Sequence, residues 1–264
     1  MTHPHHAAVT DLIRRTARDV VMRRFRQLST DHIEEKAPGD LVTVADREAE
    51  AMLAEGLAAI DREAAIVGEE AAAADPAVLD RLARDRVWIV DPIDGTHNFA
   101  HGQPPFGIMV ALVEGSETVA GWIHDPVQDR LCHAVRGGGA FVDGCRITAC
   151  PTGETPPVYA LSLLFIDPAE RAAVKAKAAP HYRLVDIPRC AAEQYPRLAL
   201  GQNDLAYFQR TLPWDHAAGA LWLNEAGGKA ARTDGTTYRP GDGRSGMFAA
   251  SSPALWDEAV RLLA

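Results

Sequence analysis

The chain has 264 residues, which is long enough to bury one large core or two closely packed sub-domains. Hydrophobic residues make up 47% of it and charged residues 24%, proportions typical of a globular protein. Its formal net charge of -9 argues against binding nucleic acid through the phosphate backbone, because such binding requires a basic surface. An anionic substrate would need a local attraction instead, for which bound divalent cations are the obvious candidate.

The N-terminal segment and the cysteines favour a cytoplasmic protein. His3, His5 and His6 lie in a polar stretch without the apolar core of a signal peptide, and we expect this stretch to fray rather than bind metal. No window approaches the roughly 20 apolar residues of a membrane span. The cysteines form no C-x-x-C pair, so buried or half-buried free thiols are favoured over a zinc site. They are Cys132, Cys145, Cys150 and Cys190.

The chain begins with helical periodicity. Apolar residues recur at helical spacing over residues 7–28, and a second helix is predicted from Asp46. Residues 36–41 between them are predicted to form a loop. Residues 71–74 are predicted to form another loop, and a short helix follows to about Ala83.

Residues 87–90 (Val-Trp-Ile-Val) are predicted to form a strand buried on both faces, because this apolar run is uninterrupted and bounded by polar residues. Glycines 137–139 are predicted to form a turn between strands, since they lack the lysine of a phosphate-binding loop. The strands of this region are predicted over residues 107–113, 119–124, 131–135 and 140–142.

The second half is predicted to alternate strands and helices, so the fold class is a layered α/β protein. A helix is predicted to start near Asp215 and to end at Gly227 and Gly228, a natural C-terminal cap. The other predicted strands lie at 158–164, 183–187, 204–208 and 246–250, and the other helices at 168–178, 190–200 and 253–263.

Acidic side chains stand directly at the ends of several elements. Asp91 and Asp94 follow the buried strand, Glu69 follows a short apolar run, and Asp46 and Asp215 stand at helix starts. Layered α/β proteins build their sites at the carboxyl ends of strands, and oxygen ligands suit Mg²⁺ or Mn²⁺ better than zinc. Taken alone, each segment is a common turn or, for Asp215, a helix N-cap. Their combination favours a metal site.

Two segments closely resemble the signatures of the inositol monophosphatase family. They are residues 87–99 (VWIVDPIDGTHNF) and residues 214–219 (WDHAAG), the latter continuing to residues 225–228 (EAGG). Residues 68–70 (GEE) and 41–46 (LVTVAD) match two further family segments in the expected order. The resemblance spans nearly the whole chain. It implies an α-β-α-β-α sandwich of the inositol monophosphatase/fructose-bisphosphatase type, usually a homodimer, and a Mg²⁺-dependent, lithium-sensitive phosphatase.

The resemblance also implies a role for each matching residue. Two or three Mg²⁺ ions, for which Mn²⁺ could substitute, would be held by Glu69, Asp91, the Ile93 carbonyl, Asp94 and Asp215. Thr96, partnered by Asp46, would orient and deprotonate the attacking water, and Glu69 would also take part in catalysis. The backbone N–H groups of Gly95 and Thr96 would hold phosphate oxygens at a helix start.

Physical chemistry agrees with this assignment. Hydrolysis of a dianionic monoester needs charge neutralisation and a nucleophile near pH 7, and two metal ions about 3.5–4 Å apart can supply both through a metal-activated water. Residues 1–150 would form an N-terminal sub-domain with the metal and phosphate site. Residues 151–264 would contribute Asp215 and the substrate-side contacts, and the two would act as one compact catalytic unit.

Three positions depart from the family's pattern on the substrate side. Phe208 stands seven positions before Asp215, where inositol-specific members carry an acidic residue that contacts ring hydroxyls. Arg189 opens residues 189–192 (RCAA), where members usually show Gly-Ser/Thr-Ala-Ala; it could contact a second phosphate or carboxylate, or only solvent. His97 replaces a commonly small residue and could touch the leaving group or simply pack at a helix start.

The substrate is therefore open among small phosphate esters. Inositol-1-phosphate or another sugar or polyol phosphate is the first candidate, with histidinol phosphate and a 3'(2'),5'-bisphosphate nucleotide as alternatives. A non-catalytic regulatory or scaffold protein is the alternative from another class, against which the complete ligand set argues. A nuclease is disfavoured by the acidic balance of the chain.

Overall fold

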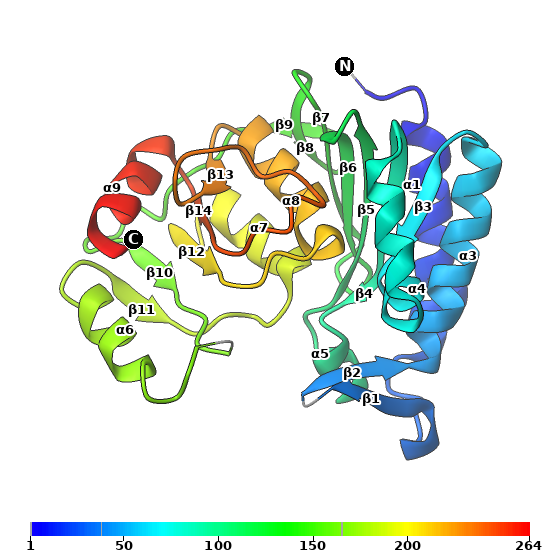
Figure 1. The fold of residues 1–264 in the computed structure, drawn as a ribbon, viewed down its shortest axis with the longest axis horizontal. Coiled ribbons are helices and arrows are strands. Elements are labelled where there is room, and N and C mark those ends of the chain that lie inside the picture. Colours follow the sequence, from blue (N-terminus) through cyan, green and yellow to red (C-terminus); the bar gives the residue numbers. More distant parts are fainter. Residues whose placement is uncertain (1, 38, 165) are drawn as a thin grey trace.

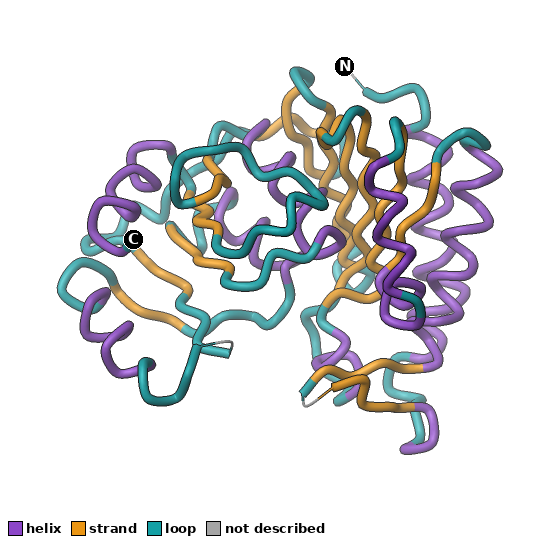
Figure 2. The backbone as a smooth tube through the Cα atoms, viewed as in Figure 1, coloured by secondary structure: helices purple, strands orange, loops and turns teal. Residues whose placement is uncertain are grey.

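The protein is a stack of five layers in the order α-β-α-β-α (Figure 1). The computed structural model describes residues 2–37, 39–164 and 166–264. Figure 2 shows the same order as two orange sheets, each covered by purple helices on both faces. The layered fold predicted from the sequence is confirmed.

The first helical layer packs on the larger sheet. Its helices are α1 (His6–Thr16) and α3 (Val44–Ile60), and α1 continues through the π-helical turn η1 (Ala17–Val21) into α2 (Met22–Arg24). Within the described residues the sheet has seven strands, ordered β3-β4-β5-β6-β7-β8-β9. They span Ala65–Gly68, Arg86–Asp94, Gly107–Glu114, Glu117–Asp125, Arg130–Val135, Gly139–Val142 and Cys145–Ile147. The pair β3 and β4 is parallel and the remaining pairs are antiparallel.

The N-terminal third differs from the sequence prediction at three places. The loop predicted over residues 36–41 is part of a hairpin of β1 (Ile33–Ala37) and β2 (Asp40–Thr43), although Pro38 lies outside the described residues. Residues 71–74, predicted as a loop, belong to helix α4 (Glu69–Ala74), because alanine favours helix. The short helix predicted after them is the 3-10 helix η3 (Pro76–Ala83), and a further 3-10 helix, η2, spans Thr30–His32. The first helix ends at Arg24, four residues early.

The middle layer consists of α7 (Ala191–Ala199) and α8 (Pro213–Glu225), enclosed between the two sheets. Helix α8 is buried around nearly its whole circumference, as expected for a helix that packs on both sides. Small residues let its backbone approach its neighbours. A Cβ at Gly219 would lie 2.0 Å from Tyr195 Cδ2, and one at Gly121 of β6 would lie 2.9 Å from Ala218 Cα. These contacts place the middle of α8 close to both β6 and α7.

The smaller sheet has the order β11-β10-β12-β14-β13 in the described part of the chain. In chain order, β10 to β14 span Val158–Ala160, Arg183–Val185, Leu205–Phe208, Lys229–Arg232 and Met247–Ala250. Its far face is covered by α6 (Arg171–Ala178) and α9 (Pro253–Leu263) around a third hydrophobic core. The strands predicted for this sheet were too long. Strand β13 of this sheet and strand β9 of the larger sheet were not predicted.

The predictions for the glycine turn, the cysteines and the N-terminal histidines had different outcomes. Glycines 137–139 do form the turn between β7 and β8. Cys145 and Cys150 are exposed, contrary to the prediction of buried or half-buried thiols. The N-terminal histidines pack against the larger sheet, whereas the sequence analysis predicted that they fray. Trp122 Nε1 donates to His6 Nδ1 at 3.0 Å. Across the described residues, every helix is too short or too polar to cross a bilayer.

Replacing Gly219 by alanine tests the packing of α8. Alanine in place of glycine gains about 1 kcal/mol of helix propensity, so a purely local effect would raise the thermal unfolding midpoint. We expect the midpoint to fall instead, by the equivalent of about 1–3 kcal/mol, because the new methyl group meets the Tyr195 ring. Differential scanning calorimetry of Gly219→Ala decides between the two, and an unchanged or raised midpoint would contradict the packing argument.

Candidate active site

The site begins where β4 ends. The buried apolar run of β4 leads into Asp91, and the register with β5 shifts between Asp91 and Asp94, so the chain bulges there. Gly95 then adopts φ +86°, a conformation that favours glycine, and a Cβ there would lie 3.0 Å from the Pro105 carbonyl oxygen. Helix α5 (Thr96–Ala100) follows at once. The turn therefore presents two carboxylates and a helix start to the same cavity.

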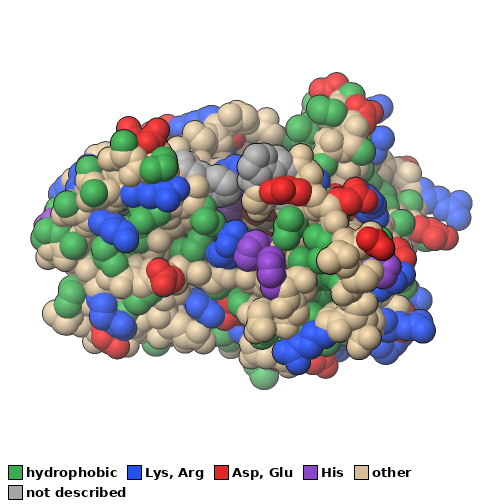
Figure 3. Space-filling model, turned by 90° about the horizontal axis from the view of Figure 1, so that it is seen from below, with side chains coloured by type: hydrophobic (Ala, Val, Ile, Leu, Met, Phe, Trp, Pro, Cys, Tyr) green, Lys and Arg blue, Asp and Glu red, His purple; other side chains and the backbone are tan. Residues whose placement is uncertain are grey.

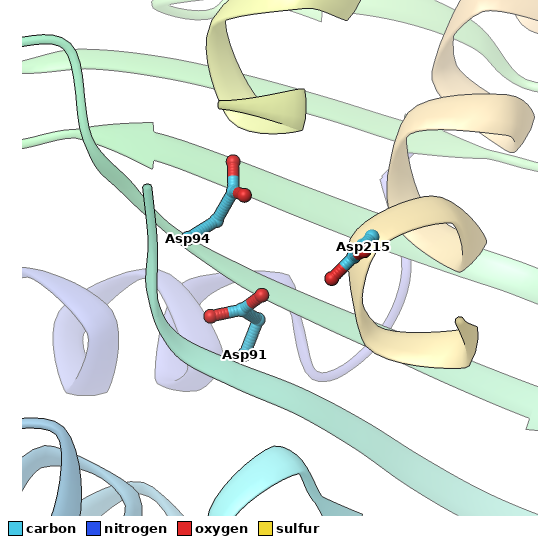
Figure 4. A group of neighbouring side chains, drawn as sticks. All are labelled: Asp91, Asp94 and Asp215. Atoms are coloured by element: carbon cyan, nitrogen blue, oxygen red, sulfur yellow. The ribbon is translucent and has the colours of Figure 1, made fainter. Parts of the chain in front are cut away.

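Asp215, in the first turn of α8, joins these carboxylates from the other half of the chain. Asp91, Asp94 and Asp215 each offer an oxygen, and the three oxygens lie within 4.8 Å of one another. Figure 4 shows their carboxylates converging, Asp91 and Asp94 from the end of β4 and Asp215 from α8. Asp91 is 1% exposed, and its Oδ1 atom has no hydrogen-bond partner among the described residues.

Glu69 stands at the adjacent strand end but has a different partner. It is the first residue of α4, directly after β3, whose Gly68 pairs with Val90 of β4. Lys36 of β1 donates from Nζ to Glu69 Oε1 at 2.8 Å and to Glu70 Oε1 at 3.0 Å. Burial lowers the pKa of Lys36, but the two carboxylates outweigh burial and raise it above its usual value. An ammonium group thus balances Glu69.

Asp46 and Thr96 form a hydrogen-bonded pair behind the cavity wall. Asp46 is completely buried in the first turn of α3, where Thr43 Oγ1 donates to its Oδ2 at 2.5 Å. Thr96 Oγ1 lies 3.1 Å from Asp46 Oδ1 and 2.9 Å from the Ile93 carbonyl oxygen, and it can donate its single proton to either. Burial raises the pKa of Asp46 to about 6. The Asp46 carboxyl can therefore take up a proton near neutral pH.

Mutual repulsion and burial dominate the electrostatics of the cluster. Burial, followed by the charges of Glu69, Asp94 and Asp215, raises the pKa of Asp91 well above its usual value. Burial also raises the pKa of Asp94 to about 6, although hydrogen bonds from Ala192 N–H and the Cys190 thiol oppose the shift. Buried carboxylates of this kind are costly unless a cation neutralises them.

The residues present fit a hard divalent cation. All the donor atoms are oxygens, and one of them, Asp91 Oδ1, is buried without a hydrogen-bond partner among the described residues. Mg²⁺ and Mn²⁺ prefer such ligands.

One cavity of about 200 Å³ collects nearly all the predicted site residues. Asp46 is not among the residues lining it, but it is hydrogen-bonded to Thr96, which does line it. The others line it: Glu69, Asp91, Ile93, Asp94, Gly95, Thr96, His97, Arg189, Phe208 and Asp215. The Phe208 ring stacks on Tyr195 with centroids 5.4 Å apart, and Arg189 Nη1 lies 3.5 Å from His97 Nε2.

The sequence interpretation missed two residues that touch the cluster. Cys190 Sγ donates to Asp94 Oδ2 at 3.0 Å, and its thiol is buried. The departure of residues 189–192 from the family pattern could have indicated Cys190, but the sequence interpretation considered only Arg189 in that segment. Lys36 gave no usable signal, because its contact with Glu69 depends on a hairpin predicted as a loop.

The chain's matches with known proteins agree with this geometry. The model of the family described as "Inositol monophosphatase family" matches residues 3–263. The chain belongs to the inositol monophosphatase family. A protein of Thermotoga maritima described as fructose-1,6-bisphosphatase/inositol-1-monophosphatase is 30% identical over 234 residues, covering 88% of this chain and 86% of that relative. A Nus factor SuhB of Vibrio cholerae is 32% identical over 226 residues, covering 83% and 80%.

Solved structures of the family share the fold. The extragenic suppressor protein suhB of Bartonella henselae superposes with a TM-score of 0.82 at 25% identity, covering 99% of this chain and 98% of that one. A Thermotoga maritima IMPase superposes with a TM-score of 0.80 at 26% identity, covering 99% and 97%. The inositol monophosphatase fold therefore covers 99% of this chain.

The raised pKa of Asp94 predicts how metal-free stability depends on pH. Its folded-state pKa of about 6 exceeds the unfolded value of about 3.9, so this aspartate destabilises the fold increasingly as pH rises through that interval. Comparing wild type with Asp94→Asn isolates this effect from His216, whose pKa burial lowers to about 3. We expect the variant's unfolding midpoint, relative to wild type, to increase from pH 4 to pH 7 in EDTA.

Thermal unfolding by circular dichroism at four pH values measures this difference. Added Mg²⁺ should raise the wild-type midpoint at pH 7 more than that of the variant, because a cation that binds the folded state stabilises it. A difference between variant and wild type that stays constant or shrinks with rising pH would contradict the electrostatic argument.

Proposed function

We propose that this protein is a Mg²⁺-dependent phosphatase that hydrolyses a small phosphate monoester, such as inositol-1-phosphate or another sugar or polyol phosphate. The observation that carries the proposal is the convergence of three carboxylates, one with an unpartnered buried oxygen, beside the Thr96–Asp46 pair. Without cations such a cluster repels a phosphate dianion. With them it becomes a binding site for one.

The candidate metal-binding residues are Glu69, Asp91, Asp94 and Asp215 with the Ile93 carbonyl oxygen, for two or three Mg²⁺ ions or for Mn²⁺ in their place. When bound, such ions neutralise phosphate charge and make water a better nucleophile near pH 7. Because Lys36 Nζ already bonds Glu69, a cation at Glu69 would replace that contact.

The chain's own groups position the water and the phosphate. With its proton donated to Asp46, the Thr96 hydroxyl oxygen can accept a hydrogen bond from a water in the cavity. That water's proton can pass to Thr96 as the hydroxyl proton passes to Asp46, whose pKa of about 6 suits a general base near neutral pH. Backbone N–H groups of Gly95 and Thr96 are the proposed phosphate contacts; in the described residues α5 has no side-chain cap.

We propose that both halves of the chain act as one catalytic unit. Residues 1–150 supply the β4 turn, Glu69 and Asp46, and residues 151–264 supply Asp215 and the wall around the alcohol. A cytoplasmic location and a homodimer stay predictions from the sequence and the family resemblance.

A second candidate is a regulatory role through a protein partner, favoured by the similarity to a protein named Nus factor SuhB. The intact carboxylate cluster favours catalysis, because a scaffold has no need for mutually repelling buried charges.

Neutralising the cluster should remove activity without unfolding the chain. We expect Asp94→Asn and Asp215→Ala to reduce phosphate release by at least about 100-fold, because each removes an oxygen anion from the candidate metal site. Asp129→Asn is the matched control, since its side chain is 76% exposed and lies outside the cavity. Normal turnover in either cluster variant, with native circular dichroism, would disprove the site assignment.

A panel of monoesters and bisphosphates, assayed with and without Mg²⁺ and with added Li⁺, tests the function itself. We expect phosphate release that requires Mg²⁺ and is inhibited by Li⁺. If no compound is hydrolysed while calorimetry shows bound Mg²⁺, the regulatory candidate replaces the phosphatase.

A further inference from the structure

The wall of the active-site cavity has an uneven charge distribution. Its acidic residues, among those described, all belong to the candidate metal set: Glu69, Asp91, Asp94 and Asp215. Two arginines, Arg189 and Arg210, also line the wall. A carboxylate could accept from the hydroxyl groups of a neutral polyol, and outside the candidate metal set the described lining residues offer none.

The alcohol side of the cavity is partly apolar and rigid. Phe208 cannot accept a hydrogen bond, and its ring is fixed between Tyr195 and His216, whose ring centroid lies 4.6 Å away. Leu164 and Ile187 extend this apolar surface toward Arg189. Between the phosphate site and the arginine there is thus a surface for the carbon skeleton of a substrate.

Arg189 is held beside the phosphate site by the backbone on both sides of it. Asn98 Nδ2 donates to the Pro188 carbonyl oxygen at 3.0 Å, and Cys190, on the other side, donates to Asp94. Arg189 itself has φ +55°, which costs a non-glycine residue about 1 kcal/mol or more. The fold maintains this conformation although a glycine would adopt it without strain.

The guanidinium of Arg189 has no acidic partner in the described residues. Its recorded polar neighbour is His97 Nε2, while His97 Nδ1 is buried and unpartnered. Burial and the charge of Arg189 both lower the pKa of His97, so the imidazole is kept neutral beside a permanent cation. An anionic group on a ligand would give the guanidinium the partner that the chain does not.

A second, more basic hollow of about 570 Å³ adjoins the first. Leu164, Ile187 and Arg189 line both hollows. Arg171 and Lys175, four residues apart on α6, line the second, against a single acid, Asp186, among its described lining residues. Figure 3 shows blue Lys and Arg side chains beside the purple histidines next to the central hollow. Positive charge therefore continues outward from Arg189.

We propose that the active site selects phosphate monoesters whose alcohol carries a second anionic group, and that Arg189, with Lys175 and Arg171, binds that group. This proposal rests on the phosphatase function proposed above. The scissile phosphate lies at the carboxylate cluster, the carbon skeleton passes Phe208, and the second phosphate or carboxylate reaches the guanidinium. A neutral polyol phosphate has no second anion and therefore makes no charged contact with the guanidinium of Arg189.

The test compares substrates that differ in the second anion. Fructose 1-phosphate and fructose 1,6-bisphosphate form the phosphate pair, and glycerol 2-phosphate and 2-phosphoglycerate form the carboxylate pair. We expect the second anion to raise kcat/KM by about tenfold or more in at least one pair, chiefly through a lower KM, because a charged hydrogen bond contributes that much. Which pair responds identifies the second group.

Variants then locate the effect. In Arg189→Gln and Lys175→Gln the ratio of kcat/KM within the responding pair should fall toward one, whereas Lys177→Gln should keep the wild-type ratio. Lys177 is on the same helix but outside both hollows, and its Nζ bonds the Leu263 carbonyl oxygen. A wild-type ratio near one in both pairs, or an unchanged ratio in both cavity variants, would overturn the proposal.

Calorimetry separates this proposal from the phosphatase function. If no substrate is hydrolysed, the phosphatase function fails, and the binding of fructose 1,6-bisphosphate relative to fructose 1-phosphate in Mg²⁺ still tests the anion site. The carboxylate pair is measured in the same way. Tighter binding of the compound with the second anion in either pair, lost in Arg189→Gln, supports the site, and equal binding within both pairs overturns it.

Discussion

Burial of several like charges at one point is the constraint on which the rest of the structure depends. Asp91, Asp94 and Asp215 repel one another in a medium that screens them poorly, and each has to be held in place by covalent geometry or by hydrogen bonds. The bulge at the end of β4, the left-handed Gly95 and the bonds from Ala192 and Cys190 to Asp94 meet this demand. Packing in the rest of the fold must therefore offset the unfavourable free energy of these buried, mutually repelling carboxylates.

The middle helical layer supplies that stability and also completes the site. Helix α8 packs against both sheets, and its run of small residues lets it lie close to β6 and α7. The same placement brings Asp215, in its first turn, to the end of β4. Packing of the core and geometry of the candidate metal site are therefore set by one helix, and a shift of α8 would disturb both.

The parts of the site formed by residues close together in the sequence could be predicted from the sequence pattern. The apolar run into Asp91 and Asp94 predicted a buried strand and an acidic turn, because both lie within a few residues. The meeting of Asp215 with that turn followed only from the family resemblance, since it depends on packing across more than 100 residues of chain. The hairpin of β1 and β2 was missed because its strands are short and mostly polar, and the contact of Lys36 with Glu69 was missed with it.

The position of Asp215 late in the chain has a consequence for how the protein is made. The strands of the larger sheet end by Ile147, and most of their pairings join neighbours in sequence, so this sheet can form early during synthesis. The candidate metal site cannot close until α8 has left the ribosome and packed between the sheets. A nascent chain thus carries Asp91 and Asp94 without Asp215, and the candidate metal site is completed only when α8 packs.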